Sequence, residues 1–207
     1  MTILKDTATT TGLRGPVDHD IRDQIIDAAD EHFSHYGYAK TTVADLAKAI
    51  GFSKAYIYKF FDSKQAIGEA ICAQCLGSVL TSVEEAVAEG RTATDKFRRL
   101  FNRISTLSAE LFFNDRKLYD IAAVSCAEKW PSSEAYQVRV AEMVNQIILE
   151  GRESGEFERK TPIDEAVRAI MLVFMPFMNP VVLQYNLDAI PDGRTEVVSL
   201  VLRSLAP

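Results

Sequence analysis

The chain has 207 residues, a mass of 23.0 kDa and a formal net charge of −6 at pH 7. Its hydrophobic fraction of 47 % and charged fraction of 25 % are ordinary for a globular protein and exclude wholesale disorder. Three cysteines are too few for a disulfide framework, so we expect a reducing, cytoplasmic compartment. No charged segment leads into an apolar run at the N-terminus, and the longest apolar run, 169–183, contains two prolines. We therefore expect neither a signal peptide nor a membrane partner.

The N-terminal segment, residues 1–17, is expected to be a flexible arm, because Gly12, Gly15 and Pro16 interrupt any helical pattern. From residue 18 onward the pattern is helical, and no alternation typical of strands occurs. The first predicted helix spans about residues 18–35, where apolar side chains recur every three or four positions.

Two short helices follow. A capping box predicts the start of the second helix, because Thr42 can accept from the amide of Asp45 while the Asp45 side chain reaches back. Gly51 ends this helix, since glycine takes a left-handed conformation without strain. The third helix is expected from Ser53 to about residue 61.

The rest of the chain predicts longer helices, about nine in all, over residues 63–90, 93–113, 115–129, 132–154, 162–187 and 192–205. The first of these has about seven turns, which is long enough to leave a small N-terminal domain and enter a second one. We therefore predict an all-α protein with a helix-turn-helix domain over 18–64 and a larger helical bundle over 65–207.

The short third helix is the candidate for reading DNA. Two short helices joined at a glycine turn and packed on a preceding helix form a helix-turn-helix. Lysines in it suit phosphates and guanine edges, and tyrosines can hydrogen-bond phosphate. From Tyr36 to Lys64, five lysines stand against Asp45 and Asp62, a local charge of +3 that leaves −9 for the rest of the chain. Such a positive tip on an acidic body orients a molecule toward a polyanion.

Ordered motifs between Ile25 and Ala70 carry a family resemblance. In chain order they are Tyr36–Gly37–Tyr38, Thr41–Thr42–Val43, Asp45–Leu46–Ala47, Gly51–Phe52–Ser53–Lys54, Ile57–Tyr58 and Ser63–Lys64. This stretch resembles the DNA-binding domain of TetR/AcrR transcriptional regulators. The resemblance covers the first third of the chain by motif and the remainder by helix number and length.

The resemblance implies a homodimer with a helix-turn-helix at each N-terminus and a C-terminal domain that binds a small-molecule effector. By position it makes Thr42, Tyr58 and Lys64 phosphate contacts, and it turns Lys54, Ala55, Tyr56 and Lys59 toward the major groove. Because free amides at a helix start bind phosphate, we add Thr41 beside Thr42. Ala55 and Tyr56 depart from the glycine and small residue common in the family, which implies an unusual base preference.

Apolar side chains in the C-terminal part are candidates for an effector pocket, because such pockets are concave and mostly apolar. For each one alone, core packing is the alternative. Pro176 is expected to open its helix, and methionines adapt to irregular shapes. The pocket candidates are Phe112, Phe113, Tyr119, Trp130, Met143, Met171, Phe174 and Met175.

The last predicted helix is apolar on much of its surface, so we expect the last two helices to form the dimer interface. The pair Cys72 and Cys75 has the spacing of some metal and redox motifs, but it lies within one predicted helix. Small apolar packing is the favoured interpretation of this pair, and a thiol sensor is the alternative.

We see no nucleophile elbow, phosphate loop or metal-ligand set, so we expect no catalysis, no metal and no cofactor. The predicted function is a repressor that binds double-stranded DNA at a palindromic operator as a dimer. A small, largely apolar effector would release it. The alternative is an all-helical small-molecule-binding protein or enzyme without DNA binding.

Overall fold

The computed structural model describes residues 16–207, apart from the side chains of residues 16–19 and 191. In this range it contains ten α-helices, one 3₁₀ helix and no strand, so the all-α prediction is confirmed. The elements are α1 (Pro16–Tyr36), α2 (Val43–Ile50), α3 (Lys54–Ile57), α4 (Lys64–Ala88), α5 (Ala93–Asn114), α6 (Arg116–Ala127), α7 (Pro131–Ser154), α8 (Ile163–Met178), α9 (Pro180–Leu183), η1 (Leu187–Ala189) and α10 (Ile190–Ser204).

The predicted arm over residues 1–17 falls outside the described residues except at its last two positions. Pro16 and Val17 belong to α1, because proline is tolerated in the first turn of a helix, where its missing amide has no intrahelical partner. The first helix therefore begins two residues earlier than predicted.

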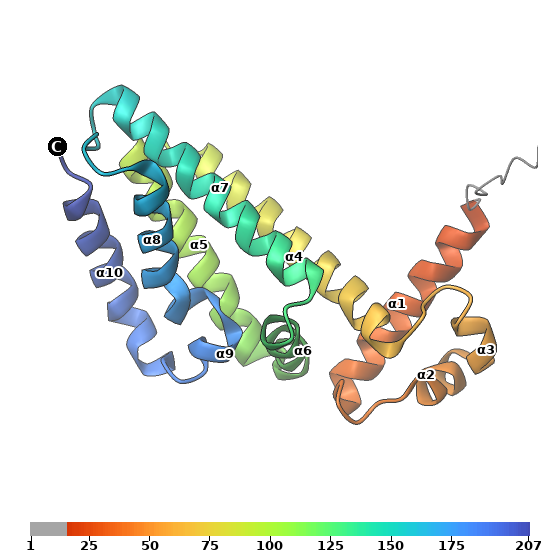
Figure 1. Cartoon of the computed structure of the whole chain (residues 1–207). Coiled ribbons are helices and arrows are strands. Elements are labelled where there is room, and N and C mark those ends of the chain that lie inside the picture. The colour runs from red at the N-terminus through yellow and green to blue at the C-terminus, as the bar shows by residue number, and fades with distance from the viewer. Residues whose placement is uncertain (1–15) are drawn as a thin grey trace, which may run out of the picture.

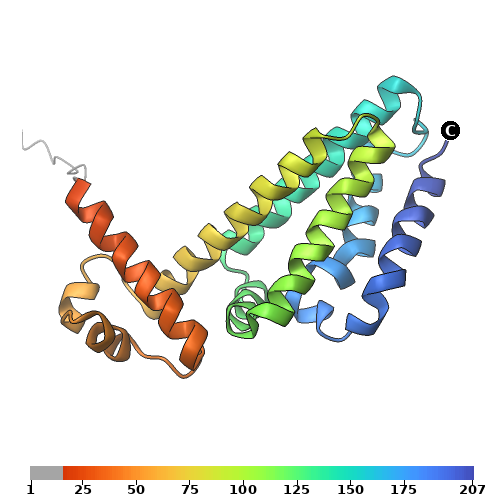
Figure 2. The same cartoon turned by 180° about the vertical axis from the view of Figure 1, so that it is seen from behind.

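Helices α1–α3 form one end of an elongated molecule, and α4 runs from this end into the larger bundle (Figure 1). Within the bundle α4 packs against α5 and α7, and α8 and α10 lie on the far side of α5 (Figure 2). The short α6 lies between the two parts and contacts both α1 and α5. Helix α4 is thus a continuous connection between the N-terminal end and the bundle.

The helix-turn-helix is built by local signals. Thr42 and Asp45 make the predicted capping box of α2, and Gly51 ends α2 with φ +78°. Ser53 caps α3 by accepting from the amide of Tyr56 at 3.1 Å. Ile57 at the end of α3 is fully buried. Ile57 therefore anchors α3 to the core, and Lys54 and Ala55 remain exposed to solvent.

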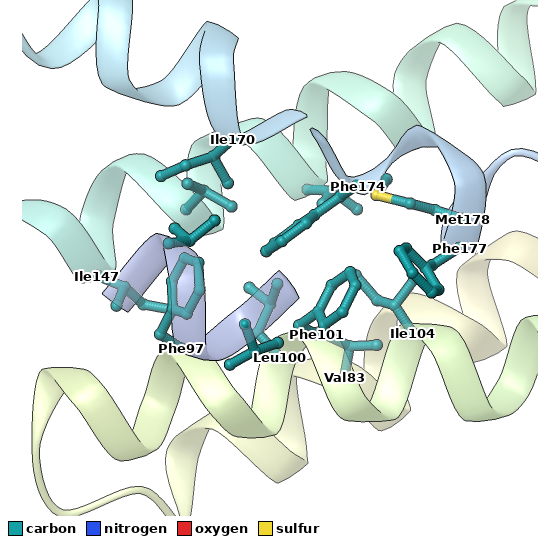
Figure 3. Close-up of a cluster of buried hydrophobic side chains, with 14 of the residues drawn as sticks. Val83, Phe97, Leu100, Phe101, Ile104, Ile147, Ile170, Phe174, Phe177 and Met178 are labelled. Carbon is teal, nitrogen blue, oxygen red and sulfur yellow. The ribbon is translucent and has the colours of Figure 1, made fainter. Parts of the chain in front are cut away.

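Two hydrophobic clusters divide the molecule. The N-terminal cluster combines the inner faces of α1–α3 with the start of α4, and it also takes in Ile121 and Trp130 from the other part of the chain. The bundle cluster joins α5, α7, α8 and α10. At its centre the rings of Phe101 and Phe174 stack with centroids 3.7 Å apart, and Phe177 meets Phe101 edge-on (Figure 3).

The helix predicted over 162–187 is divided in two, which is why ten helices replace the nine expected. Asn179 has an extended backbone before Pro180, as residues preceding proline usually do, and its side chain caps α9. Pro176, in contrast, lies inside α8.

Helix α4 is the one helix in the described range that length and composition would allow to cross a membrane. Core helices of soluble proteins have the same property. Here α4 packs against α1, α5, α6 and α7.

Candidate functional site

The outer surface of α3 presents the residues expected to read DNA. Lys54, Ala55 and Lys59 are exposed, and Tyr58 is 42 % exposed. The Lys54 Nζ lies 5.7 Å from the centre of the Tyr58 ring, a cation–π distance. The exposed edge of α3 and the turn after it therefore carries positive charge beside aromatic surface, which suits contact with a nucleic acid.

Tyr56 has a different position from its neighbours. It is half-buried, because its ring packs edge-on between Phe52 at 5.1 Å and Phe60 at 5.4 Å. The Lys59 Nζ lies 5.4 Å from the same ring. The rings of Phe52 and Phe60 therefore fix the position of Tyr56 along α3.

The start of α2 differs from the expectation in one residue. Thr41 is 2 % exposed, and its hydroxyl donates to the Gly37 carbonyl at 2.9 Å. A buried hydroxyl cannot reach a phosphate, so we remove Thr41 from the candidate contacts. Thr42 is exposed, and its hydroxyl donates to the Asp45 carboxylate at 2.7 Å. Hydrogen bonds from Thr42 lower the pKa of Asp45, which keeps that carboxylate charged and the cap closed.

Lys64 begins α4 and is half-buried. Its Nζ donates to the Tyr38 carbonyl at 3.0 Å and lies 4.3 Å from the centre of the Tyr38 ring. Lys64 therefore ties α4 to the α1–α2 turn, and any contact with phosphate would be made from this position.

A corner between α6 and α7 supports the N-terminal end. Trp130 is 1 % exposed, meets Tyr38 edge-on with centroids 5.7 Å apart, and donates to Glu128 at 2.8 Å. A Cβ at Gly68 would lie 2.9 Å from Tyr38 and 3.1 Å from Trp130, so only glycine lets α4 pass this close. Glu69 accepts from both the amide and the hydroxyl of Ser132.

A cavity of about 510 Å³ lies between α4, α5, α6, α7 and the α8–α9 junction. Its wall combines residues of both hydrophobic clusters: Ile71 and Ile121 belong to the N-terminal cluster, and Tyr136 and Met178 belong to the bundle cluster. The volume falls in the range of small-molecule sites, and most of the wall is apolar. Occupation of this cavity would therefore act on the boundary between the two parts of the molecule.

Two of the eight predicted pocket residues, Tyr119 and Met175, line the cavity. The Tyr119 hydroxyl donates to the Pro180 carbonyl at 2.5 Å, and burial raises the pKa of Tyr119 to about 12. The predicted opening of the helix at Pro176 is wrong, because α8 continues to Met178 and ends only at Asn179. Residues on both sides of this end, Met175, Met178 and Pro180, line the cavity.

The other six predicted pocket residues lie elsewhere, so our prediction is revised at those positions. Phe174 is fully buried against Phe101, and Trp130 belongs to the N-terminal cluster. Phe113 is 69 % exposed. Phe112, Met143 and Met171 are partly buried against the bundle cluster. Helical spacing cannot separate these roles, because a residue that faces inward can meet either another helix or a cavity.

All three cysteines line the cavity, which sequence reasoning missed. Burial raises the pKa of Cys72 to about 12, and it also raises the pKa of Cys75 and Cys126. Protonated thiols are poor nucleophiles, so these side chains act at neutral pH as small, polarisable wall groups. A usable signal was the stripe of small residues Cys75, Ser78 and Ser82, which repeats every three or four positions on α4 and leaves room beside it.

Comparisons with known proteins cover both parts of the chain. Residues 25–71 match the family described as bacterial regulatory proteins, tetR family, and residues 93–198 match the tetracyclin repressor-like C-terminal domain. The fatty acid metabolism regulator protein of Bacillus subtilis is 28 % identical over 142 residues, which are 65 % of this chain and 70 % of that protein. A negative transcriptional regulator of the biofilm operon icaADBC of Staphylococcus aureus is 47 % identical over 49 residues, 24 % of this chain and 26 % of that protein.

Solved structures share the fold. A transcriptional regulator from Cytophaga hutchinsonii aligns with a TM-score of 0.68 at 23 % identity over 89 % of this chain and 98 % of that one. The transcriptional regulator FadR of Bacillus subtilis in complex with stearoyl-CoA aligns with a TM-score of 0.66 at 22 % identity over 87 % and 97 %. The matches over residues 25–71 and 93–198 confirm the family predicted from the motifs between Ile25 and Ala70, and the solved structures agree in fold. The chain belongs to the tetR family of bacterial regulatory proteins and is a DNA-binding transcriptional regulator.

Proposed function

We propose that the protein is a dimeric repressor that binds a palindromic operator through α3 and leaves it when a small, largely apolar effector enters the cavity. The observation that carries this proposal is the position of the cavity. It lies where the cluster that supports α3 meets the cluster that builds the bundle.

The reading surface supports DNA contact by Lys54, Ala55, Tyr58 and Lys59 from the exposed side of α3 and its following turn. Thr42 and Lys64 flank this surface at the starts of α2 and α4 and are the candidate phosphate contacts. Tyr56 contributes from a half-buried position. The acidic balance of the rest of the chain makes this end the one that a polyanion approaches.

The dimer is proposed to form through α8 and α10, the two long helices nearest the C-terminus. Large apolar side chains are exposed there: Leu172 at 71 %, Val173 at 42 % and Leu200 at 58 %. Water-exposed apolar groups on two neighbouring helices favour burial against a second copy. A two-fold axis at this face would place one α3 in each protomer. The two copies of α3 could then bind two major grooves on one side of DNA, which are about 34 Å apart or a multiple of that.

We propose that a ligand inserted in the cavity, between α4 and α6, causes release from DNA. The wall residues Ile71 and Cys72 lie on α4 just beyond the reading domain, and Ile121 faces them from α6. A ligand between these helices would favour a different angle of α1–α3 relative to the bundle. Only its differential affinity for the two arrangements matters, and a few kcal/mol suffices.

The names of similar proteins agree with this proposal. The Staphylococcus aureus relative is a negative regulator, and the Bacillus subtilis structure holds stearoyl-CoA. Negative regulation and a ligand with a long apolar portion are both consistent with a reading helix joined to an apolar cavity.

The test uses the full chain and DNA fragments that contain the region upstream of its own gene. We expect salt-dependent binding to one fragment with an inverted repeat, two protein chains per site by analytical ultracentrifugation, and weaker binding when the repeat is disrupted. Equal affinity for every fragment of the same length at physiological salt would overturn the proposed sequence-specific function.

A further inference from the structure

The charged side chains of the cavity wall are all acidic. Glu110 and Asp115, at the C-terminal end of α5, line the cavity, and its wall contains no lysine, arginine or histidine among the described residues. The remaining polar wall groups are neutral hydroxyls, amides and protonated thiols. One end of an otherwise apolar cavity therefore carries negative charge.

Asp115 lies without a cation. One carboxylate oxygen accepts from the Leu118 amide at 3.0 Å as the cap of α6, and the other accepts from the Ser34 hydroxyl at 3.5 Å. The adjacent Arg116 is paired with Asp120 at 3.1 Å instead. The capping carboxylate thus has hydrogen bonds but no neutralising partner among the described residues.

A second carboxylate lies behind Asp115. Asp30, on α1, has one buried carboxylate oxygen that makes no hydrogen bond. Burial raises the pKa of Asp30, and the charge of Asp115 raises it further. Asp30 does not line the cavity, so Asp115 is the carboxylate of this pair that a cation in the cavity would reach.

The deep wall offers an unused hydrogen-bonding group. Ser125 is 1 % exposed, lines the cavity, and apart from a weak contact with the Cys72 thiol its hydroxyl has no hydrogen-bond partner. A buried hydroxyl without a partner costs stability until something in the cavity pairs with it. Together with the acidic end, it indicates a ligand with polar groups at defined places.

The apolar part of the wall is long. Along α4 it extends from Ile71 to Ser82, which is about 16 Å at the helical rise of ~1.5 Å per residue. At the Ser82 end the hydroxyl accepts from the Arg103 guanidinium at 2.7 and 2.8 Å, outside the wall itself. Carboxylates therefore line the end near α1, where the Arg116 guanidinium lies outside the wall, 5.3 Å from the centre of the Tyr119 ring, and Arg103 lies beyond the opposite end.

We propose that the effector is a cationic amphiphile, with a protonated or quaternary amine at the Asp115 end and an apolar body along α4. This inference rests on the proposed function, because it names the chemical class of the effector. A cation gains an ion pair in a partly water-excluded site, whereas an anionic head would meet two carboxylates. Since Asp115 also contacts Ser34 of α1, the charged end of the ligand lies against the helix that supports the reading domain.

The test compares three compounds with one alkyl chain: decylamine, 1-decanol and decanoate, below their aggregation concentrations. Binding to the full chain without DNA is measured at pH 7 by calorimetry. We expect decylamine to bind about tenfold tighter than decanol, and decanoate to bind more weakly than decanol.

In the variant Asp115→Asn, which retains the capping oxygen, the affinity for decylamine should fall about tenfold, while the affinity for decanol changes less than twofold. Glu165→Gln, an exposed charge change on α8 away from the cavity wall, is the matched control and should change nothing.

Three results would overturn the inference: tightest binding of decanoate or an acyl-CoA, an equal loss for amine and alcohol in Asp115→Asn, or no binding of any of the three compounds. The first would assign the polar head to the Arg103 end. Because these measurements contain no DNA, their failure leaves operator binding untouched. A chain that binds decylamine but no specific DNA would instead contradict the proposed function.

Discussion

The N-terminal end and the bundle differ in how far apart in sequence the residues that cap their helices lie. In the helix-turn-helix, each helix start is capped by a residue three positions away, as with Thr42 and Asp45 or with Ser53 and Tyr56. In the bundle, Thr92 caps α5 in the same local way through the Asp95 amide, but Glu156 also accepts from the amides of Ala93 and Thr94, more than sixty positions away. Local caps therefore define both α2 and α3, whereas the start of α5 combines a local cap with a distant one.

This difference matches the two tasks. A surface that fits a DNA groove has to present the same side chains in every state, and short-range signals accomplish this. A cavity that is proposed to change the angle between two parts has to involve both, and its wall draws on α4, α5, α6, α7 and the α8–α9 junction.

The largest expected effect concerns the corner where the two regions meet. Trp130→Ala should lower the free energy of unfolding by about 3–5 kcal/mol, because the ring is fully buried in the N-terminal cluster although it comes from the start of α7. Urea unfolding measures this loss. Phe113→Ala removes an aromatic ring that is 69 % exposed and should cost much less. Similar losses in the two variants would show that Trp130 does not join the regions.

Substitutions on the DNA-contacting surface of α3 should change the affinity for DNA rather than the stability of the fold. Lys54→Ala is expected to cost about 1–3 kcal/mol on the operator and to relax the base preference, whereas Tyr58→Phe should weaken binding to all sequences alike. Titrations against the operator and against variants with one changed base pair distinguish these two outcomes. Lys160→Ala, an exposed lysine between α7 and α8, is the control. A uniform loss for Lys54→Ala across all sequences would contradict its role as a base reader.

The smallest expected effect tests distant capping in the bundle. Burial opposes ionisation of Glu156, but the amides of Thr94 and Ala93 outweigh it and lower its pKa from 4.5 to about 2. Because the folded-state pKa lies below the unfolded value, this carboxylate stabilises the fold above about pH 4.5, and the contribution is lost as the pH falls toward 2. Glu156→Gln should therefore be less stable than the natural chain by about 1 kcal/mol at pH 7.

Thermal unfolding at a series of pH values measures the gap between Glu156→Gln and the natural chain. The gap should be constant from pH 7 to about 5 and close below it. A gap that persists unchanged at pH 2 would mean that the ionised carboxylate is not the cap. Thr42→Ala, which removes a local cap without a charge of its own, should show a similar loss at pH 7.

Much of the helix-turn-helix could be predicted from neighbouring residues. The Thr42–Asp45 box, the Gly51 turn, the Ser53 cap and the inward side of Ile57 all follow from spacing over at most four positions. Thr41 could not be placed this way, because its hydroxyl also lies 3.3 Å from a ring nitrogen of His32, nine positions earlier in α1.

The cavity could be predicted only in outline. An apolar pocket in the C-terminal part follows from composition, and Tyr119 and Met175 were among the expected wall residues. The predicted opening at Pro176 was wrong, because the helix continues to Met178. Phe174 and Met175 are neighbours in sequence, yet one stacks in the core and the other faces the cavity. Which of two adjacent apolar residues meets a void depends on how α8 is rotated against α5.

The sequence by itself determined the all-helical class and the helix-turn-helix, because helical periodicity, caps and glycine turns act between residues close in the chain. The family followed from the resemblance of the ordered motifs between Ile25 and Ala70. Only the tertiary structure decided that Trp130 supports the reading domain, that three cysteines share one wall, and that Asp115 lies beside α1 without a cation. These features depend on the relative placement of helices that are far apart in sequence. That placement is set by packing of the whole chain rather than by any local pattern.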